Sequence, residues 1–203
     1  AGTLKHFDLL IPTPESTPLA ITDLSESRTS YMLSKICGEA LCQQAGIPFT
    51  IIRPHNVYGP RMGMAHVIPE QLRKAHYAKE GEDIDVYSLD HTRCFCYIDD
   101  AVDILWRIME YQICEGKTLN LGTQNPEVTI KDVVDACFKV VGRKLSVNAK
   151  PASEGSPARR VPDMSKTIDL IEFESQVSLL DGVERTYNWY INNVFKDGGV
   201  SAQ

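Results

Sequence analysis

The pattern of apolar and polar positions predicts helices alternating with short buried strands. Apolar residues recur at a helical period over residues 29–44, and Gly46 follows as a stop signal. Residues 49–53 form a nearly continuous apolar run, as in the buried strands of parallel sheets. A helix joined by a short link to a buried strand is half of a βαβ unit, so the pattern favours an α/β fold.

The same criteria extend the prediction along the chain. Helices are predicted over 66–79, 99–111, 129–141 and 178–193, and strands over 84–87, 93–98, 117–121 and 145–148. Thr129 and Asp132 have the spacing of a capping box. Residues 11–18 are rich in proline and predict an irregular loop.

The helix over 99–111 has two further predicted features. Asp99 or Asp100 can cap its start, which we favour over a catalytic pair of carboxylates. Val102, Leu105 and Met109, together with Ile108, form the apolar stripe expected to face the core.

Tyr31 and Lys35 are the first candidates for chemistry. Side chains four residues apart lie on the same side of a helix, one turn above the other. A neighbouring ammonium favours the ionised form of a phenol, whose free pKa is about 10. The pair is therefore a candidate acid–base device; the alternative is an aromatic residue packed on the sheet beside a solvated lysine.

Pro54, His55 and Asn56 directly follow the predicted strand over 49–53. Ligands bind beyond the carboxyl ends of strands in open α/β sheets, so these residues are candidates for a binding site. Two alternatives stay open: Asn56 as a turn residue that satisfies its own backbone, and His55 as a packing residue.

Composition and charge exclude several classes of partner. The net charge is −6 and the 21 basic residues form no dense cluster, which argues against nucleic acid and anionic membranes. No apolar run reaches the roughly 20 residues of a membrane span, and the N-terminus is unlike a signal peptide.

The six cysteines contain no Cys-x-x-Cys pair, and the five histidines are scattered. This spacing does not predict a metal site. Buried free thiols in a reducing cytoplasm are the simplest interpretation, so we expect a cytoplasmic protein.

Five blocks in fixed order carry a resemblance to a known family. They cover residues 30–39, 51–60, 93–101, 120–122 and 160–166. Together they resemble the extended short-chain dehydrogenase/reductases, specifically the NAD-dependent epimerase/dehydratase family that acts on nucleotide sugars. The resemblance extends over about residues 11–190.

The resemblance implies an architecture. The fold would be α/β, the C-terminal part of a Rossmann-like doubly wound parallel sheet with a small α+β substrate-binding lobe. Residues 1–58, joined by about 99–123, would belong to the NAD-binding domain, and residues 59–98 and 124–203 to the nucleotide-sugar lobe. The helix that carries Tyr31 would form a homodimer contact.

The resemblance also implies the cofactor and its contacts. Tyr31 would take or return the proton of a sugar hydroxyl while hydride moves to or from a nicotinamide. Lys35 would hold the nicotinamide ribose and favour the phenolate, and the backbone of Pro54 and His55 would approach the nicotinamide. NAD is the expected cofactor, with NADP as an open alternative.

For the substrate, the resemblance implies a nucleotide-diphosphate sugar. Asn56 would donate a hydrogen bond to it, and Arg93 and Arg160 would bind the diphosphate, with Arg159 as the alternative to Arg160. Arginine suits this role because its planar fork of donors matches phosphate oxygens. The sugar, the base and the choice among epimerase, dehydratase and decarboxylase stay open.

The sequence also departs from the family. It contains no glycine-rich strand–turn–helix for the dinucleotide, so we expect a C-terminal portion that binds dinucleotide poorly by itself. Thr3 is the only hydroxyl within reach in sequence for the catalytic Ser/Thr, but residues 1–6 do not match the family's pattern, so the identity of that residue stays open. Two alternatives remain: a non-catalytic sugar-nucleotide-binding remnant, and a reductase acting on a non-sugar alcohol, against which the paired arginines argue.

Overall fold

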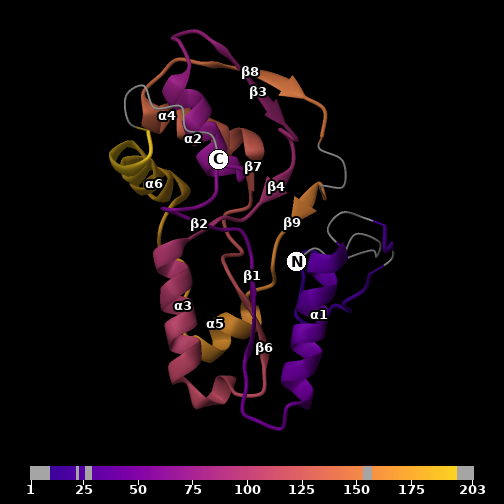
Figure 1. The fold of residues 1–203 in the computed structure, drawn as a ribbon. Helices are drawn as coiled ribbons and strands as arrows, with labels where there is room; N and C mark the ends of the chain where they lie inside the picture. The colour runs from indigo at the N-terminus through magenta and orange to yellow at the C-terminus, as the bar shows by residue number, and fades with distance from the viewer. Residues whose placement is uncertain (1–9, 22, 26–28, 153–156, 196–203) are drawn as a thin grey trace.

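The computed structural model describes residues 10–21, 23–25, 29–152 and 157–195, so Thr3 lies outside the described residues (Figure 1). The helices are α1 (Thr29–Gln44), α2 (Val67–Tyr77), α3 (Ile98–Glu110), α4 (Ile130–Val141), α5 (Ser165–Ile171) and α6 (Leu179–Asn193), with a 3₁₀ turn η1 (Gln112–Cys114). The strands are β1 (Ile51–Pro54), β2 (Val57–Tyr58), β3 (Asp83–Tyr87), β4 (Thr92–Arg93), β5 (Cys96–Tyr97), β6 (Thr118–Leu121), β7 (Val128–Thr129), β8 (Ser146–Lys150) and β9 (Arg159–Arg160).

Most strand pairs are parallel. β1 pairs with β6, β2 with β5 and β3 with β8, each in parallel. β4 lies between β7, which is antiparallel to it, and β9, which is parallel. The mixed α/β class and the parallel pairing of the buried run over 49–53 are thereby confirmed.

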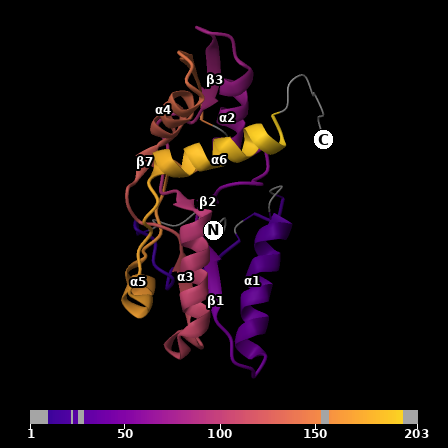
Figure 2. The same ribbon diagram turned by 90° about the vertical axis from the view of Figure 1, so that its left-hand side faces the viewer.

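At one end of the molecule, β1 and β6 lie between α1 on one side and α3 with α5 on the other (Figures 1 and 2). Apolar side chains of α3, β6 and α5 form a core there, including Ile104, Leu119 and Ile171. α1 is tied to β1 by Arg53, whose guanidinium donates to both oxygens of Glu39 at 2.9 and 2.7 Å.

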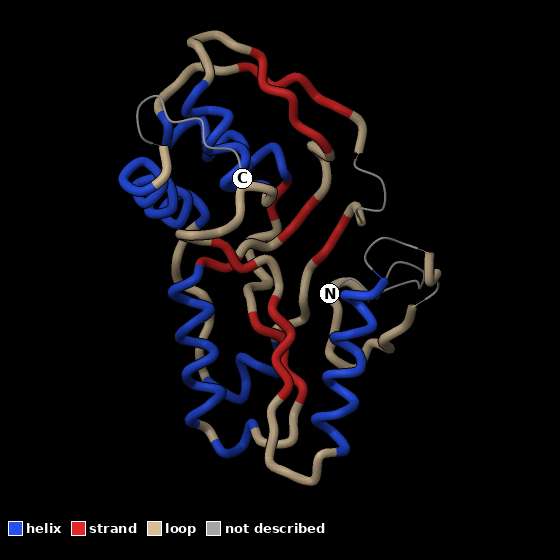
Figure 3. The backbone as a smooth tube through the Cα atoms, viewed as in Figure 1, coloured by secondary structure: helices blue, strands red, loops and turns tan. Residues whose placement is uncertain are grey.

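At the other end, α2 and α4 pack against the β3–β8 pair, and α6 packs on α2 and α4 (Figures 1 and 3). Leu72, Val134, Val183 and Tyr190 are buried in the cores between these elements. The short strands β2, β4 and β5 connect the two ends, and the residues with candidate chemistry lie near this connection.

The predicted cap of α3 is wrong. The helix begins at Ile98, and Tyr97 occupies the N-cap position without a side-chain cap. The Oδ2 of Asp100 instead accepts hydrogen bonds from the backbone N–H groups of Gln176 and Val177, at 3.0 and 2.9 Å. Asp100 therefore fixes the loop between α5 and α6. Because its carboxylate is engaged by that loop, it does not cap α3.

The predicted apolar stripe of α3 is confirmed at Ile108 and wrong at Val102, Leu105 and Met109. Ala101, Ile104 and Ile108 are buried, whereas Val102 and Met109 are 52% and 72% exposed. Both sets have helical spacing, and the contacts of α3 with β6 and α5 select the first.

Several other predictions are confirmed. The helix over 29–44 has the predicted bounds, and Thr129 with Asp132 forms a complete capping box. The predicted strand over 93–98 is interrupted and becomes β4 and β5. Four cysteines are buried as expected, but Cys37 and Cys42 on α1 are exposed.

None of the helices in the described ranges combines the length and the apolar character that a bilayer crossing requires.

Candidate functional site

α1 presents Tyr31 and Lys35 together. The ammonium nitrogen of Lys35 lies 5.3 Å from the centroid of the Tyr31 ring, a cation–π contact. Tyr31 is 55% exposed, so its ring is not packed against the sheet. α1 begins at the level of the carboxyl ends of β1 and β6 (Figures 1 and 3). The first turns of α1, which carry both residues, therefore lie near the edge of the sheet at which β1 ends.

His55 is buried directly beyond β1, and its tautomer follows from its neighbour Asn120. The amide nitrogen of Asn120 donates to the carbonyls of Thr13 and Asp163, at 3.1 and 3.0 Å. The amide oxygen of Asn120 therefore faces His55 Nε2 at 3.0 Å and accepts its proton. His55 Nδ1 is then a buried acceptor without a hydrogen-bond partner among the described residues.

Burial keeps His55 neutral. It lowers the pKa of the imidazole to about 4, against an opposing effect of the hydrogen bond to Asn120. The positive charges of Arg160 and Arg53 lower this pKa further.

This pKa shift predicts a loss of stability in mild acid. The folded pKa of His55 (about 4) lies below its ordinary value (6.5), so the unfolded chain binds the proton first. The free energy of unfolding should therefore fall as the pH drops from about 6.5 toward 4, by up to about 3 kcal/mol from this residue. Urea unfolding at pH 7 and pH 4.5 measures the effect.

The His55→Gln variant isolates this contribution, because glutamine retains a donor for Asn120 but does not titrate. Its stability should depend less on pH than that of the natural chain. Replacing the exposed His66 with Gln should leave the dependence unchanged. An equal pH dependence in the natural chain and His55→Gln would show that His55 is not responsible.

Asn56 follows with a left-handed backbone (φ 42°). Its side-chain amide donates to the carbonyl of Cys94 at 3.0 Å, and its own carbonyl accepts from the N–H of Cys96 at 3.2 Å. These bonds to the β4–β5 segment replace the predicted alternative, in which Asn56 satisfies its own turn. Asn56 is thereby held beside the strand that carries Arg93.

Arg93 and Arg160 are neighbours across parallel strands. The register of β4 and β9 pairs their Cα atoms directly, so both side chains leave the same face. The guanidinium of Arg93 donates to the carbonyls of Pro157 and Ala158, at 2.6 and 3.1 Å. Burial and then the charge of Arg160 lower the pKa of Arg93 to about 10.

Arg159 has a different role. Its guanidinium makes a two-pronged ion pair with the carboxylate of Glu127, with both distances at 2.7 Å. Glu127 also accepts a hydrogen bond from the hydroxyl of Thr92. Of the two consecutive arginines, Arg160 is therefore the one in register with Arg93.

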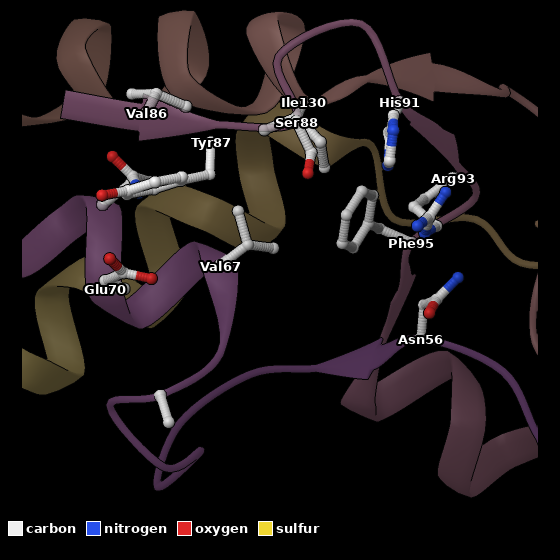
Figure 4. A pocket seen from close by; sticks show the side chains of 12 residues that line it. Asn56, Val67, Glu70, Val86, Tyr87, Ser88, His91, Arg93, Phe95 and Ile130 are labelled. Carbon is white, nitrogen blue, oxygen red and sulfur yellow. The ribbon is translucent and has the colours of Figure 1, made fainter. Parts of the chain in front are cut away.

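A pocket of about 350 Å³ opens beside Arg93. Figure 4 shows Asn56, His91 and Arg93 on one side of it and Glu70 with Tyr87 across from them. Its volume lies in the range of small-molecule sites. Its two sides differ in charge, because one carries a guanidinium and the other a carboxylate.

Unpartnered buried atoms mark this region. Among the described residues, three buried side-chain atoms lack a hydrogen-bond partner: His55 Nδ1, Gln71 Oε1 and His91 Nδ1. Gln71 and His91 line the pocket. A buried polar atom without a partner costs about 1–3 kcal/mol, and two of these three atoms belong to residues that line the pocket.

The structure thus brings some predicted site residues together and separates others. Asn56 and Arg93 line the same pocket, whereas Tyr31, Lys35, Pro54, His55 and Arg160 do not contribute to its lining.

Sequence reasoning missed Gln71 and His91. Gln71 is a polar residue within the apolar face of α2, between Ile68 and Ala75, and that position is a signal that could have identified it. Among the described residues, no three His, Cys, Asp or Glu side chains are grouped to hold a metal ion.

The sequence matches the model of the NAD dependent epimerase/dehydratase family over residues 7–122. It is 31% identical over 179 residues to UDP-N-acetyl-alpha-D-glucosaminuronate decarboxylase of Bacillus cytotoxicus, covering 82% of this chain and 54% of that protein. It is 32% identical over 198 residues to GDP-L-fucose synthase 1 of Arabidopsis thaliana, covering 90% of this chain and 59% of that protein. The chain therefore spans between half and three-fifths of these curated relatives.

Solved structures show the same fold. UDP-glucose 4-epimerase of Thermotoga maritima, solved with UDP-glucose, superposes with a TM-score of 0.75 at 23% identity, covering 93% of this chain and 60% of that one. UDP-glucuronic acid 4-epimerase of Bacillus cereus, solved with UDP-glucuronic acid and NAD, gives 0.71 at 24% identity, covering 91% and 62%.

Proposed function

Because the chain belongs to the NAD dependent epimerase/dehydratase family, we propose that it forms the substrate-binding and acid–base part of an NAD-dependent enzyme that modifies nucleotide-diphosphate sugars. The names of its relatives, a UDP-sugar decarboxylase and GDP-L-fucose synthases, support this substrate class. The UDP-sugars and NAD held by the similar solved structures support it further.

The observation that carries the proposal is the pairing of Arg93 with Arg160. Two guanidinium groups on adjacent strands repel each other, and burial of Arg93 increases the cost. An anion bound beside them offsets that cost, and arginine forks match the oxygens of a diphosphate. In this proposal a diphosphate next to the pocket would meet both cations.

The pocket supports the same class of ligand. Asn56 and Arg93 provide donors and positive charge at one side, and the other side is lined by acceptors and the ring of Tyr87 (Figure 4). A nucleoside diphosphate has the matching polarity, with anionic phosphates at one end and a flat base with N–H groups at the other.

The residues around the end of β1 fit a nicotinamide. His55 lies directly beyond β1, and the exposed Tyr31 and Lys35 belong to α1, whose first turns lie near the same sheet edge. We propose that Pro54 and His55 border the nicotinamide and that Lys35 binds its ribose. A bound NAD supplies the hydride acceptor and donor.

Tyr31 would move the proton. In the proposed reaction its phenolate oxygen takes a proton from a sugar hydroxyl, and it returns the proton in the reverse direction. The ammonium of Lys35 lies over the Tyr31 ring, so the two side chains of the proposed acid–base pair are in contact.

We also propose the division of labour along the chain. Residues 1–58 and about 99–123 would belong to the part that binds the dinucleotide. Residues 59–98 and 124–203 would form the part that binds the nucleotide sugar. α1 would pair with its copy in a homodimer, which the exposed Leu33 and Leu41 support. A cytoplasmic location suits two exposed thiols on that helix.

The test is a turnover assay. The protein is incubated with NAD and a panel of UDP- and GDP-sugars, and the products are separated by anion exchange and identified by mass spectrometry. We expect an altered sugar on an intact nucleoside diphosphate. Binding of nucleotide sugars without turnover, in a sample whose NAD binding has been verified by titration, would instead identify a non-catalytic binding module. Turnover of uncharged alcohols alone would identify a reductase of another substrate class.

A further inference from the structure

His91 lines the pocket on the same side as Arg93 (Figure 4). It lies two residues before Arg93, where the chain enters β4. Side chains two residues apart along an extended chain leave the same face, which accounts for this placement. The imidazole therefore neighbours the guanidinium that the proposed function assigns to the diphosphate.

A tight turn fixes the backbone of His91. Its N–H donates to the carbonyl of Ser88 at 3.0 Å, and its own carbonyl accepts from the N–H of Ile130 at 2.9 Å. The N–H of Lys131 donates to the carbonyl of Leu89 at 3.1 Å, so the turn is bound at two points to the first residues of α4. A ligand at this place does not have to order the backbone that carries the imidazole.

The two ring nitrogens of His91 have different surroundings. Nδ1 is enclosed and has no hydrogen-bond partner among the described residues, so a ligand in the pocket does not reach it. Nε2 also has no hydrogen bond to a described residue, but it is not enclosed. Because His91 lines the pocket, Nε2 is the nitrogen that a ligand can contact.

The enclosed Nδ1 selects the tautomer of His91. In a neutral imidazole one nitrogen carries the proton and the other a lone pair. Enclosed N–H groups without an acceptor are rarer in folded proteins than enclosed acceptors without a donor, as backbone groups show. The proton therefore belongs on Nε2, and His91 presents an N–H donor to the pocket.

Arg93 complements this donor. Its Nη1 donates to the carbonyls of Thr92 and Ala158, at 2.6 and 3.1 Å, and its Nη2 donates to the carbonyl of Pro157 at 2.6 Å. Several of its N–H groups are thus engaged within the protein, while its positive charge remains. A neighbouring N–H adds a directed hydrogen bond to the attraction that this charge provides.

We propose that His91 is a further diphosphate-binding residue, whose Nε2–H donates to a phosphate oxygen of the nucleoside diphosphate beside Arg93. The inference rests on the proposed function, because it takes the ligand at Arg93 to be a diphosphate. A phosphate oxygen suits this place because it only accepts hydrogen bonds and because the adjacent guanidinium attracts its charge.

The experiment is an NMR chemical-shift titration of the natural chain and two variants. Each is titrated with UDP or GDP, whichever the natural chain binds more tightly, and with the corresponding nucleoside. His91→Leu removes the donor and should weaken the diphosphate about ten- to hundredfold, the range for a hydrogen bond to a charged group. Affinity for the nucleoside should not change. His91→Gln restores a side-chain N–H and should recover most of the lost affinity.

His66→Leu is the matched control. His66 is exposed and lies between Ala65 and Val67 of the pocket, but it does not itself contribute to the lining, so its loss should leave the affinity unchanged. Nitrogen-15 spectra of the natural chain add a test that needs no variant. They should show the proton of His91 on Nε2, and the Nε2 signal should shift with the nucleoside diphosphate and not with the nucleoside.

The outcomes separate this inference from the proposed function. Unchanged diphosphate affinity in a folded His91→Leu, or an equal loss for the nucleoside, would overturn the role of His91 and leave the proposed function intact. A proton on Nδ1, or an Nε2 signal that the diphosphate does not move, would do the same. Failure of the natural chain to bind either nucleoside diphosphate at millimolar concentration would overturn both.

Discussion

Replacing Tyr31 with Phe is expected to lower kcat by about 10²–10⁴-fold, the usual contribution of a positioned acid–base group. The substitution removes one oxygen from a ring that is 55% exposed, so the fold should be unaffected. Binding of the nucleotide sugar should also be unchanged, because Tyr31 does not line the pocket that holds Arg93. Steady-state kinetics with the substrate identified by the turnover assay measure kcat, and calorimetry measures binding.

Tyr77→Phe is the matched control, since Tyr77 is 54% exposed and lies outside the proposed site. Its kcat should equal that of the natural protein. If Tyr31→Phe kept most of its turnover, the phenol could not be the group that carries the proton.

Replacing Arg93 with Ala is expected to weaken nucleoside-diphosphate binding by about 2–5 kcal/mol, or roughly 30- to 5,000-fold in Kd. The variant leaves the phosphates without a fork-shaped cation at a buried position, where water replaces it poorly. Titration of the natural and variant chains with GDP, UDP and the corresponding nucleosides measures the change. The loss should appear for the diphosphates and be absent for guanosine and uridine.

Arg93 also holds the carbonyls of Pro157 and Ala158, so thermal unfolding of Arg93→Ala must accompany the titration. Arg93→Lys retains the charge and should recover part of the affinity. Arg159→Ala is the control, because that arginine is engaged by Glu127 and its loss should alter affinity little. An unchanged affinity in Arg93→Ala would favour a substrate without a diphosphate.

Local patterns in the sequence were sufficient for most of the longer elements of the fold, whereas α5 and the two-residue strands β2, β7 and β9 were not predicted. The stop at Gly46, the apolar run before Pro54 and the capping box of Thr129 depend on neighbours within a few residues, and each was predicted. The buried face of α3 was not. Its two apolar stripes have the same period, and only packing against β6 and α5 distinguishes them.

The candidate site divides in a similar way. Asn56 and Arg93 were predicted from motifs, and the structure places them on one pocket. The choice between Arg159 and Arg160 required the strand register, which the sequence does not contain. The neutral state of His55 follows from its burial and its tautomer from Asn120, 65 residues away, so neither could be read from a local pattern.

Asn120 has a mechanical consequence for the whole molecule. Its amide group binds Thr13, His55 and Asp163 at once, and Thr13 is also bonded through its backbone to Val161 and Asp163. The segment that directly follows Arg160, up to Asp163, is therefore hydrogen-bonded to Thr13 and to Asn120, the residue that also binds His55. We expect ligand binding near His55 and ligand binding near Arg160 to be coupled, because a displacement of either residue is transmitted through the hydrogen bonds of Asn120. The two ends of the molecule should rotate about this connection and should not separate at it.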